Sequence, residues 1–117
     1  MPKGKTILLV DSNAKLRQLR AAILSNLGHI ITQAGTLEEA RDFWQPKQFH
    51  LLVVSVQNQL TAAMEFCEEI KQADPEQLVA FLTSLTTYVS RDSCPDDVIH
   101  KEEGPAHFVD KVQELLA

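Results

Sequence analysis

The chain alternates short apolar runs with longer stretches in which apolar residues recur at helical spacing. Five runs have the length and composition of strands, namely 6–11, 29–34, 51–56, 78–83 and 97–100. Most are almost continuously apolar, without the polar alternation of a half-exposed sheet. This is typical of strands that are buried on both faces of a parallel sheet. The pattern therefore predicts five buried strands.

Helix signals fill the gaps between the first three runs. Ser12 is expected to cap a helix that Gly28 ends, with apolar positions at Leu16, Leu19, Ile23 and Leu27. Thr36 and Glu39 have the spacing of a capping box. The sequence thus predicts a second helix through Phe43 and Trp44 that ends before Pro46.

Two further helices are expected in the second half of the chain. Thr61 opens one that stops at Asp74-Pro75, and the last spans Pro105–Leu116. Their predicted inward faces carry Met64, Cys67 and Ile70 in the first and Phe108, Val112 and Leu115 in the second. The stretch 84–97 is rich in Ser and Thr and contains Pro95, so any helix there should be short or irregular.

Strands that alternate with helices predict a parallel sheet covered on both faces, because parallel neighbours need crossover connections. We expect a single domain over 1–117 with a flavodoxin-like (βα)5 three-layer α/β sandwich and strand order 2-1-3-4-5. In such sheets the functional crevice lies at the carboxyl ends of the strands, beside the switch point. The residues expected there are Asp11, Ser12, Ser55, Thr83 and Lys101.

The composition and net charge argue against several classes of function. The 117 residues carry a net charge of −5 with scattered basic residues, which disfavours nucleic-acid binding. The start of the chain has no leader-like pattern and no apolar stretch is long enough for a membrane span, so we expect a cytoplasmic protein without a membrane contact. The histidines lack ligand spacing. Cys67 and Cys94 suggest neither a disulfide framework nor a zinc site, and Cys67 is interpreted as a plain core thiol.

Four segments resemble the receiver domain of bacterial two-component response regulators, and the resemblance extends over essentially the whole chain. They are ILLVDSN at the first strand, LLVVS at the third, VAFLTS at the fourth and VIHK at the fifth. In that family, two acids after strand 1 and an aspartate at the end of strand 3 hold Mg²⁺. The aspartate accepts a phosphoryl group from a histidine kinase, and a hydroxyl residue on strand 4 and a lysine after strand 5 contact the phosphoryl oxygens.

The resemblance assigns the first acid to Asp11, the hydroxyl to Thr83 and the lysine to Lys101. Ser12 stands in place of the second acid, and Ser55 stands in place of the phosphoacceptor aspartate. Val98 replaces the strand-5 aromatic that commonly reorients on activation.

These substitutions leave one carboxylate facing one lysine. Mg²⁺ loses its water reluctantly and usually needs one or two carboxylates plus phosphate oxygens, so no useful metal site is expected. A serine hydroxyl is a poor nucleophile without an adjacent base. The expected resting state is an ion pair between Asp11 and Lys101, with Ser55 and Thr83 hydrogen-bonded nearby.

Other chemistry finds little support. The loop after the first strand has no glycine, which disfavours a P-loop, a dinucleotide site and a flavin-binding flavodoxin. Ser55 lacks the flanking glycines of a hydrolase elbow. We therefore expect no enzyme activity and no cofactor.

Two hypotheses remain. The first is a phosphorylation-independent pseudo-receiver that acts by contact with a protein, such as an effector domain, a kinase-pathway protein or a second copy in a homodimer. Its expected surface is the face of helix 4, strand 5 and helix 5, with the rim at 98–107. The second is a phosphoryl-accepting receiver in a phosphorelay that uses a substitute residue such as Asp11.

Overall fold

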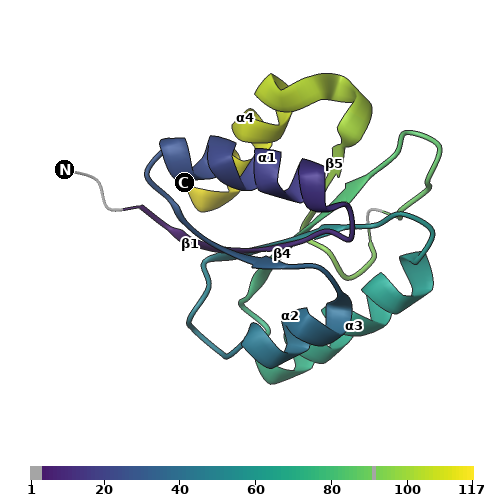
Figure 1. The fold of residues 1–117 in the computed structure, drawn as a ribbon. Coiled ribbons are helices and arrows are strands. Elements are labelled where there is room, and N and C mark those ends of the chain that lie inside the picture. The colour runs from purple at the N-terminus through teal and green to yellow at the C-terminus, as the bar shows by residue number, and fades with distance from the viewer. Residues whose placement is uncertain (1–3, 91) are drawn as a thin grey trace.

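Five parallel strands form one sheet in the computed structural model, which describes residues 4–90 and 92–117 (Figure 1). Their order across the sheet is β2-β1-β3-β4-β5, which confirms the predicted flavodoxin-like topology. The strands are β1 (Thr6–Val10), β2 (Ile30–Ala34), β3 (Leu51–Ser55), β4 (Leu78–Thr83) and β5 (Asp97–His100).

Helices cover both faces of the sheet. α1 (Ala14–Asn26) and α4 (Gly104–Leu116) lie on one face, and α2 (Leu37–Phe43) and α3 (Leu60–Ala73) lie on the other (Figure 1). A short 3-10 turn, η1 (Lys101–Glu103), joins β5 to α4. None of the helices in the described residues is long and apolar enough to cross a bilayer.

The central strands supply side chains to two separate cores. Ile7 and Leu9 of β1 pack with α1 and α4, whereas Leu8 packs with α2 and α3, because successive residues of a strand point to opposite faces. Phe66 and Phe81, both fully buried, are the largest side chains of the second core. Burial on both faces explains why the strands are almost continuously apolar.

The connection between β4 and β5 differs from the predicted fivefold repeat. Its described residues form no helix, so four α-helices accompany the five strands and the (βα)5 description is corrected at this unit. Local turns replace the helix, with the amide of Thr87 donating to the Ser84 carbonyl and that of Ser93 to the Ser90 carbonyl. The expectation of an irregular segment is confirmed, since Ser and Thr compete for backbone hydrogen bonds.

The two cysteines are paired, in contrast to the prediction of a free core thiol. Cys67 of α3 is fully buried and forms a disulfide with Cys94, which lies in the connection between β4 and β5. Their Cα atoms are 6.2 Å apart, within the range that a disulfide bond requires. No spacing signal marks this pair, because the two residues are 27 positions apart and come together only in the folded chain.

The start of α1 also differs from the prediction. Asn13, not Ser12, caps the helix, since its side-chain oxygen accepts a hydrogen bond from the Leu16 amide at 3.1 Å. Leu16 and Leu19 are 39% and 57% exposed, while Ala21 and Leu24 face the core. The exposed leucines follow helical spacing but lie on a different face from the one that packs on the sheet.

Candidate functional site

Four predicted site residues lie at the same edge of the sheet. Asp11 follows β1, Ser55 and Thr83 end β3 and β4, and Lys101 follows β5. The parallel register places the ends of these strands side by side, because Val10 pairs with Val54 and Ser55 with Leu82. The expected location is therefore observed, while the chemical role of each residue remains a prediction.

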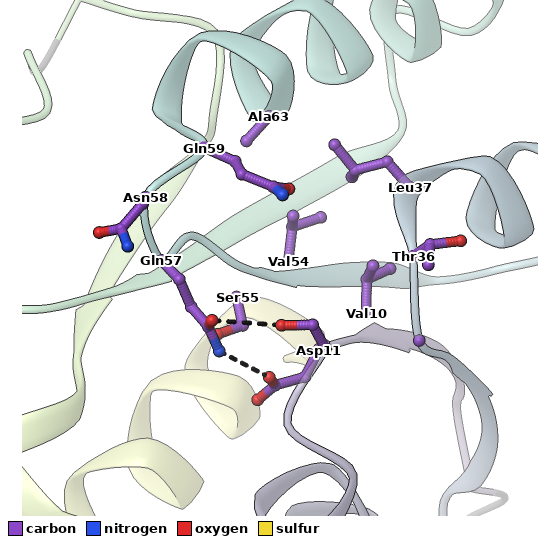
Figure 2. A pocket seen from close by; sticks show the side chains of 12 residues that line it. Val10, Asp11, Thr36, Leu37, Val54, Ser55, Gln57, Asn58, Gln59 and Ala63 are labelled. Atoms are coloured by element: carbon purple, nitrogen blue, oxygen red, sulfur yellow. Dashed lines mark hydrogen bonds between the residues drawn. The ribbon is translucent and has the colours of Figure 1, made fainter.

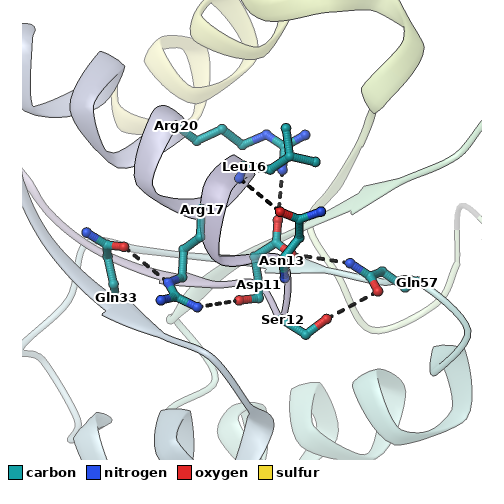
Figure 3. Close-up of polar contacts among 8 residues, drawn as sticks. All are labelled: Asp11, Ser12, Asn13, Leu16, Arg17, Arg20, Gln33 and Gln57. Carbon is teal, nitrogen blue, oxygen red and sulfur yellow. Dashed lines mark hydrogen bonds and ion pairs between the residues drawn. The ribbon is translucent and has the colours of Figure 1, made fainter.

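The Asp11 carboxylate is buried and fully engaged by donors (Figure 3). Its Oδ1 accepts hydrogen bonds from the Asn13 amide at 2.9 Å and from Gln57 Nε2 at 3.3 Å. Its Oδ2 pairs with Arg20 Nη1 at 2.8 Å. The acid is 1% exposed, so these three donors replace the water that an exposed carboxylate would bind.

Arg20, not Lys101, is the ionic partner of Asp11, which corrects the predicted pair. Arg20 reaches back from α1, and its side chain is 13% exposed. Lys101 takes part in none of the ion pairs found between described residues. Burial lowers the pKa of Lys101 and the Arg20 charge adds to this, while Asp11 opposes it. One carboxylate thus faces two cations.

Ser12 and Ser55 line a cavity of about 130 Å³ beside Asp11, on the side of α2 and α3 (Figure 2). Gln57 links two residues of the cavity wall, because it accepts a hydrogen bond from Ser12 Oγ at 3.2 Å and donates one to the Asp11 carboxylate. Thr83 does not line this cavity. The structure therefore brings Asp11, Ser12 and Ser55 together around one small space.

The hydroxyls of Ser55 and Thr83 have no hydrogen-bond partner within the described part of the chain. Both oxygen atoms are buried. The prediction that they form hydrogen bonds beside an Asp11–Lys101 ion pair is wrong, because neither has a described partner and the Asp11 carboxylate is paired with Arg20.

Lys101 opens onto a different cavity from Ser55. This space of about 170 Å³ lies between α1 and α4 and also contains Arg20 and His100 in its wall. Its other lining residues are mostly apolar, namely Leu16, Leu19, Ile23, Leu82, Gly104, Pro105 and Phe108. The five predicted residues therefore share a sheet edge but not one continuous pocket.

Val98 points to the face of the sheet opposite that of its neighbour Ile99, and it is half-buried in the wall of a groove of about 540 Å³. Residues 85–90 of the β4–β5 connection form the facing wall. The position that carries an aromatic in the receiver family therefore borders an open groove, and no helix covers it in the described residues.

The residues present do not fit Mg²⁺. A hard dication needs several oxygen ligands, with one or two carboxylates among them. Both oxygens of Asp11 already accept hydrogen bonds, and one is bound to a guanidinium at 2.8 Å. Within residues 4–90 and 92–117, no cluster of three acidic, histidine or cysteine side chains could hold a metal ion.

Sequence reasoning missed Arg20 and Gln57. A signal for Arg20 was present, since the helix after a buried strand-end acid carries arginines at positions 17 and 20, one turn apart. Arg17 lies beside Arg20 and donates to the Asp11 backbone carbonyl at 2.9 Å. A buried acid needs a cation, and the turn that follows it is the nearest source.

Comparison with known proteins rests on structure. No protein-family model and no curated protein matches the sequence. The receiver domain of HemR from Leptospira biflexa superposes with a TM-score of 0.87 at 20% identity, covering 97% of this chain and 94% of that one. The response regulator TrrA of Thermotoga maritima, in complex with Mg²⁺-BeF, gives 0.84 at 25% identity, covering 96% and 99%.

TrrA is also similar to this chain as it stands in a complex with the histidine kinase ThkA, with a TM-score of 0.82 at 25% identity and coverage of 97% and 99%. In each case the match covers nearly the full length of both chains. The chain has the fold of a response-regulator receiver domain.

Proposed function

We propose that this chain is an atypical receiver that acts in signal transduction through protein contact and accepts no phosphoryl group. One observation carries the proposal. Ser55 occupies the end of β3, and Asp11, the one acid among the described residues that line its cavity, is paired with Arg20 at 2.8 Å.

The chemistry of phosphoryl transfer supports this view. An acceptor must be a nucleophile, and a hydroxyl needs an adjacent base to become one near neutral pH. Ser55 Oγ has no hydrogen-bond partner among the described residues, and both carboxylate oxygens of Asp11 accept hydrogen bonds from other donors. The same shortage of a base disfavours a hydrolase that would use Ser55. Asp11 itself, as a substitute acceptor, would have to leave Arg20, Asn13 and Gln57 first.

Protein contact is the remaining route for a signal. The regulator TrrA is found in a complex with the histidine kinase ThkA, which supports a protein partner for a chain of the same fold. The face expected for this contact is made by the β4–β5 connection, β5 and α4, with the connection replacing the predicted helix. Leu85 and Tyr88 are 57% and 82% exposed there. An effector domain, a kinase-pathway protein or a second copy could bind this face.

The test is incubation with Mg²⁺ and acetyl phosphate, followed by intact mass spectrometry. A receiver of ordinary sequence, treated in parallel, shows that the phosphodonor is active. We expect the mass of this chain to stay unchanged. A gain of a base-labile phosphoryl group would overturn the proposal, and loss of that gain in Asp11→Asn would establish the alternative in which Asp11 accepts it.

A matched metal titration separates the two parts of the argument. We expect no Mg²⁺ binding by the natural chain in calorimetry. Restoring acids in a Ser12→Asp/Ser55→Asp variant with Arg20→Ala should create measurable binding, because three carboxylates then face Lys101. Equal binding by both proteins would contradict the role assigned to Arg20.

A further inference from the structure

We propose that Cys67 and Cys94 form a reversible thiol–disulfide site that controls the position of the β4–β5 connection, residues 84–96. The proposal concerns the chain itself and rests on the function proposed above only for its effect on a partner.

The two cysteines differ in burial and in the regularity of the backbone around them. Cys67 is fully buried in α3 within the core of Phe66, Ile70 and Phe81. Cys94 is half-buried and lies in a stretch without helix or strand. A dithiol reductant therefore reaches Cys94 first and forms a mixed disulfide with it, while the Cys67 sulfur leaves, takes up a proton and stays in the core as a thiol.

Hydrogen bonds hold this connection mainly at its two ends. At the start, Glu102 accepts from Ser84 Oγ at 2.9 Å and from the Leu85 amide at 3.0 Å. At the end, Asp96 accepts from Lys71 Nζ at 2.7 Å and from the Val79 amide at 2.8 Å.

Between these ends, every hydrogen bond found for described residues 86–90 and 92–94 stays inside the connection. Examples are the amides of Thr86 and Asp92, which donate to the hydroxyls of Ser84 and Ser90. Val89 and Cys94 also pack against the core. The disulfide is thus the one covalent tie between the middle of this segment and the folded layers.

The location of the disulfide favours control over simple stabilisation. Small domains use disulfides when their core is insufficient, but this sheet has a packed core on each face. The bond instead fixes one wall of the groove that contains Val98, with Leu85 and Tyr88 on the same wall. Its loss leaves both cores intact and frees the wall.

The redox step is balanced by an external dithiol. Two electrons and two protons pass from the dithiol to the Cys67–Cys94 bond, which yields two thiols here and a disulfide in the reductant. Oxidised glutathione reverses the exchange. The state of the pair would then set the shape of the proposed partner face.

The test is hydrogen–deuterium exchange of the folded protein, oxidised and reduced with dithiothreitol, with alkylation to count thiols by mass. We expect two thiols to appear on reduction and exchange in 84–96 to become several-fold faster, while peptides of β1 and β3 stay unchanged. Oxidised glutathione should restore the slow exchange. Cys94→Ser should match the reduced protein in either condition.

Three results would overturn the proposal. These are free thiols in the protein under oxidising conditions, equal exchange of 84–96 in both states, or reduction only after global unfolding. No phosphodonor, metal or partner enters this experiment. Its failure would therefore leave the phosphorylation test unaffected, and the reverse also holds.

Discussion

Replacement of Arg20 by alanine should destabilise the fold strongly, because it strands a buried charge. The Asp11 side chain is fully buried, and Arg20 supplies the only positive charge within ion-pair distance of it in the described residues. Removing one member of a buried pair typically costs about 3–5 kcal/mol. Arg20 is 13% exposed, so water can enter the vacated space and the lower end, about 3 kcal/mol, is expected.

The loss of unfolding free energy can be measured as a fall in melting temperature. Globular proteins unfold with an entropy of about 2.1 cal/mol/K per residue, so for this chain about 3 kcal/mol corresponds to a fall of about 12 °C. The assay is thermal and urea unfolding at pH 7, followed by circular dichroism.

The matched control is Glu69→Gln, which breaks an exposed ion pair and leaves Arg41 in place over the Phe66 ring. The Arg41 and Glu69 side chains are 38% and 53% exposed, so less than about 1 kcal/mol should be lost. Arg20→Ala should cost much less in an Asp11→Asn background, where no charge is stranded. Equal losses for Arg20→Ala and Glu69→Gln, or simple additivity with Asp11→Asn, would refute the reasoning.

Single substitutions test the roles of Lys101, Glu102, Thr36 and Cys94. Lys101→Met should raise the melting temperature, because burial disfavours the charged lysine and lowers its pKa in the folded protein. Between the folded and the unfolded pKa of Lys101, the unfolded chain binds more protons. The natural protein therefore gains stability there as pH rises, and the variant does not. The pKa of Glu102 is lowered mainly by a hydrogen bond from its own backbone amide, so its contribution to stability is present above the unfolded carboxyl pKa and is lost as pH falls. Glu102→Gln should accelerate hydrogen exchange of the Leu85 amide at neutral pH, measured by NMR. Thr36→Ala should cost about 1 kcal/mol in urea unfolding through loss of the α2 cap. Cys94→Ser should lose about 3.5 kcal/mol against the oxidised protein by loop-closure entropy, and nothing comparable against the reduced one.

The sheet could be predicted because its strands are buried on both faces. That burial makes each strand an apolar run, and the helices between them fix the strands as parallel. The packed face of α1 could not be read in the same way. Leu16 and Leu19 are bulkier than Ala21, yet Ala21 faces the sheet together with Leu24. Close approach of a helix to a sheet favours a small residue at the contact, and hydrophobicity alone does not reveal that choice.

The site was predictable in position but not in pairing. Asp11 and Ser55 follow directly from the strand ends, since topology brings the carboxyl ends together. The partner of Asp11 depends on how far a long arginine side chain reaches back from α1 to the sheet edge, which residue types alone do not determine. The Cys67–Cys94 pair depends likewise on tertiary proximity.

The short β5 has a consequence for self-association. Among the described strands it pairs only with β4, so its other edge offers unpaired backbone donors and acceptors to any incoming strand. β5 has only four residues and begins at Asp97, whose carboxylate lies 3.5 Å from Lys111 Nζ. Brevity and charge both discourage the addition of a foreign strand. An extension of β5 by apolar residues would remove this protection and open a route to edge-to-edge aggregation.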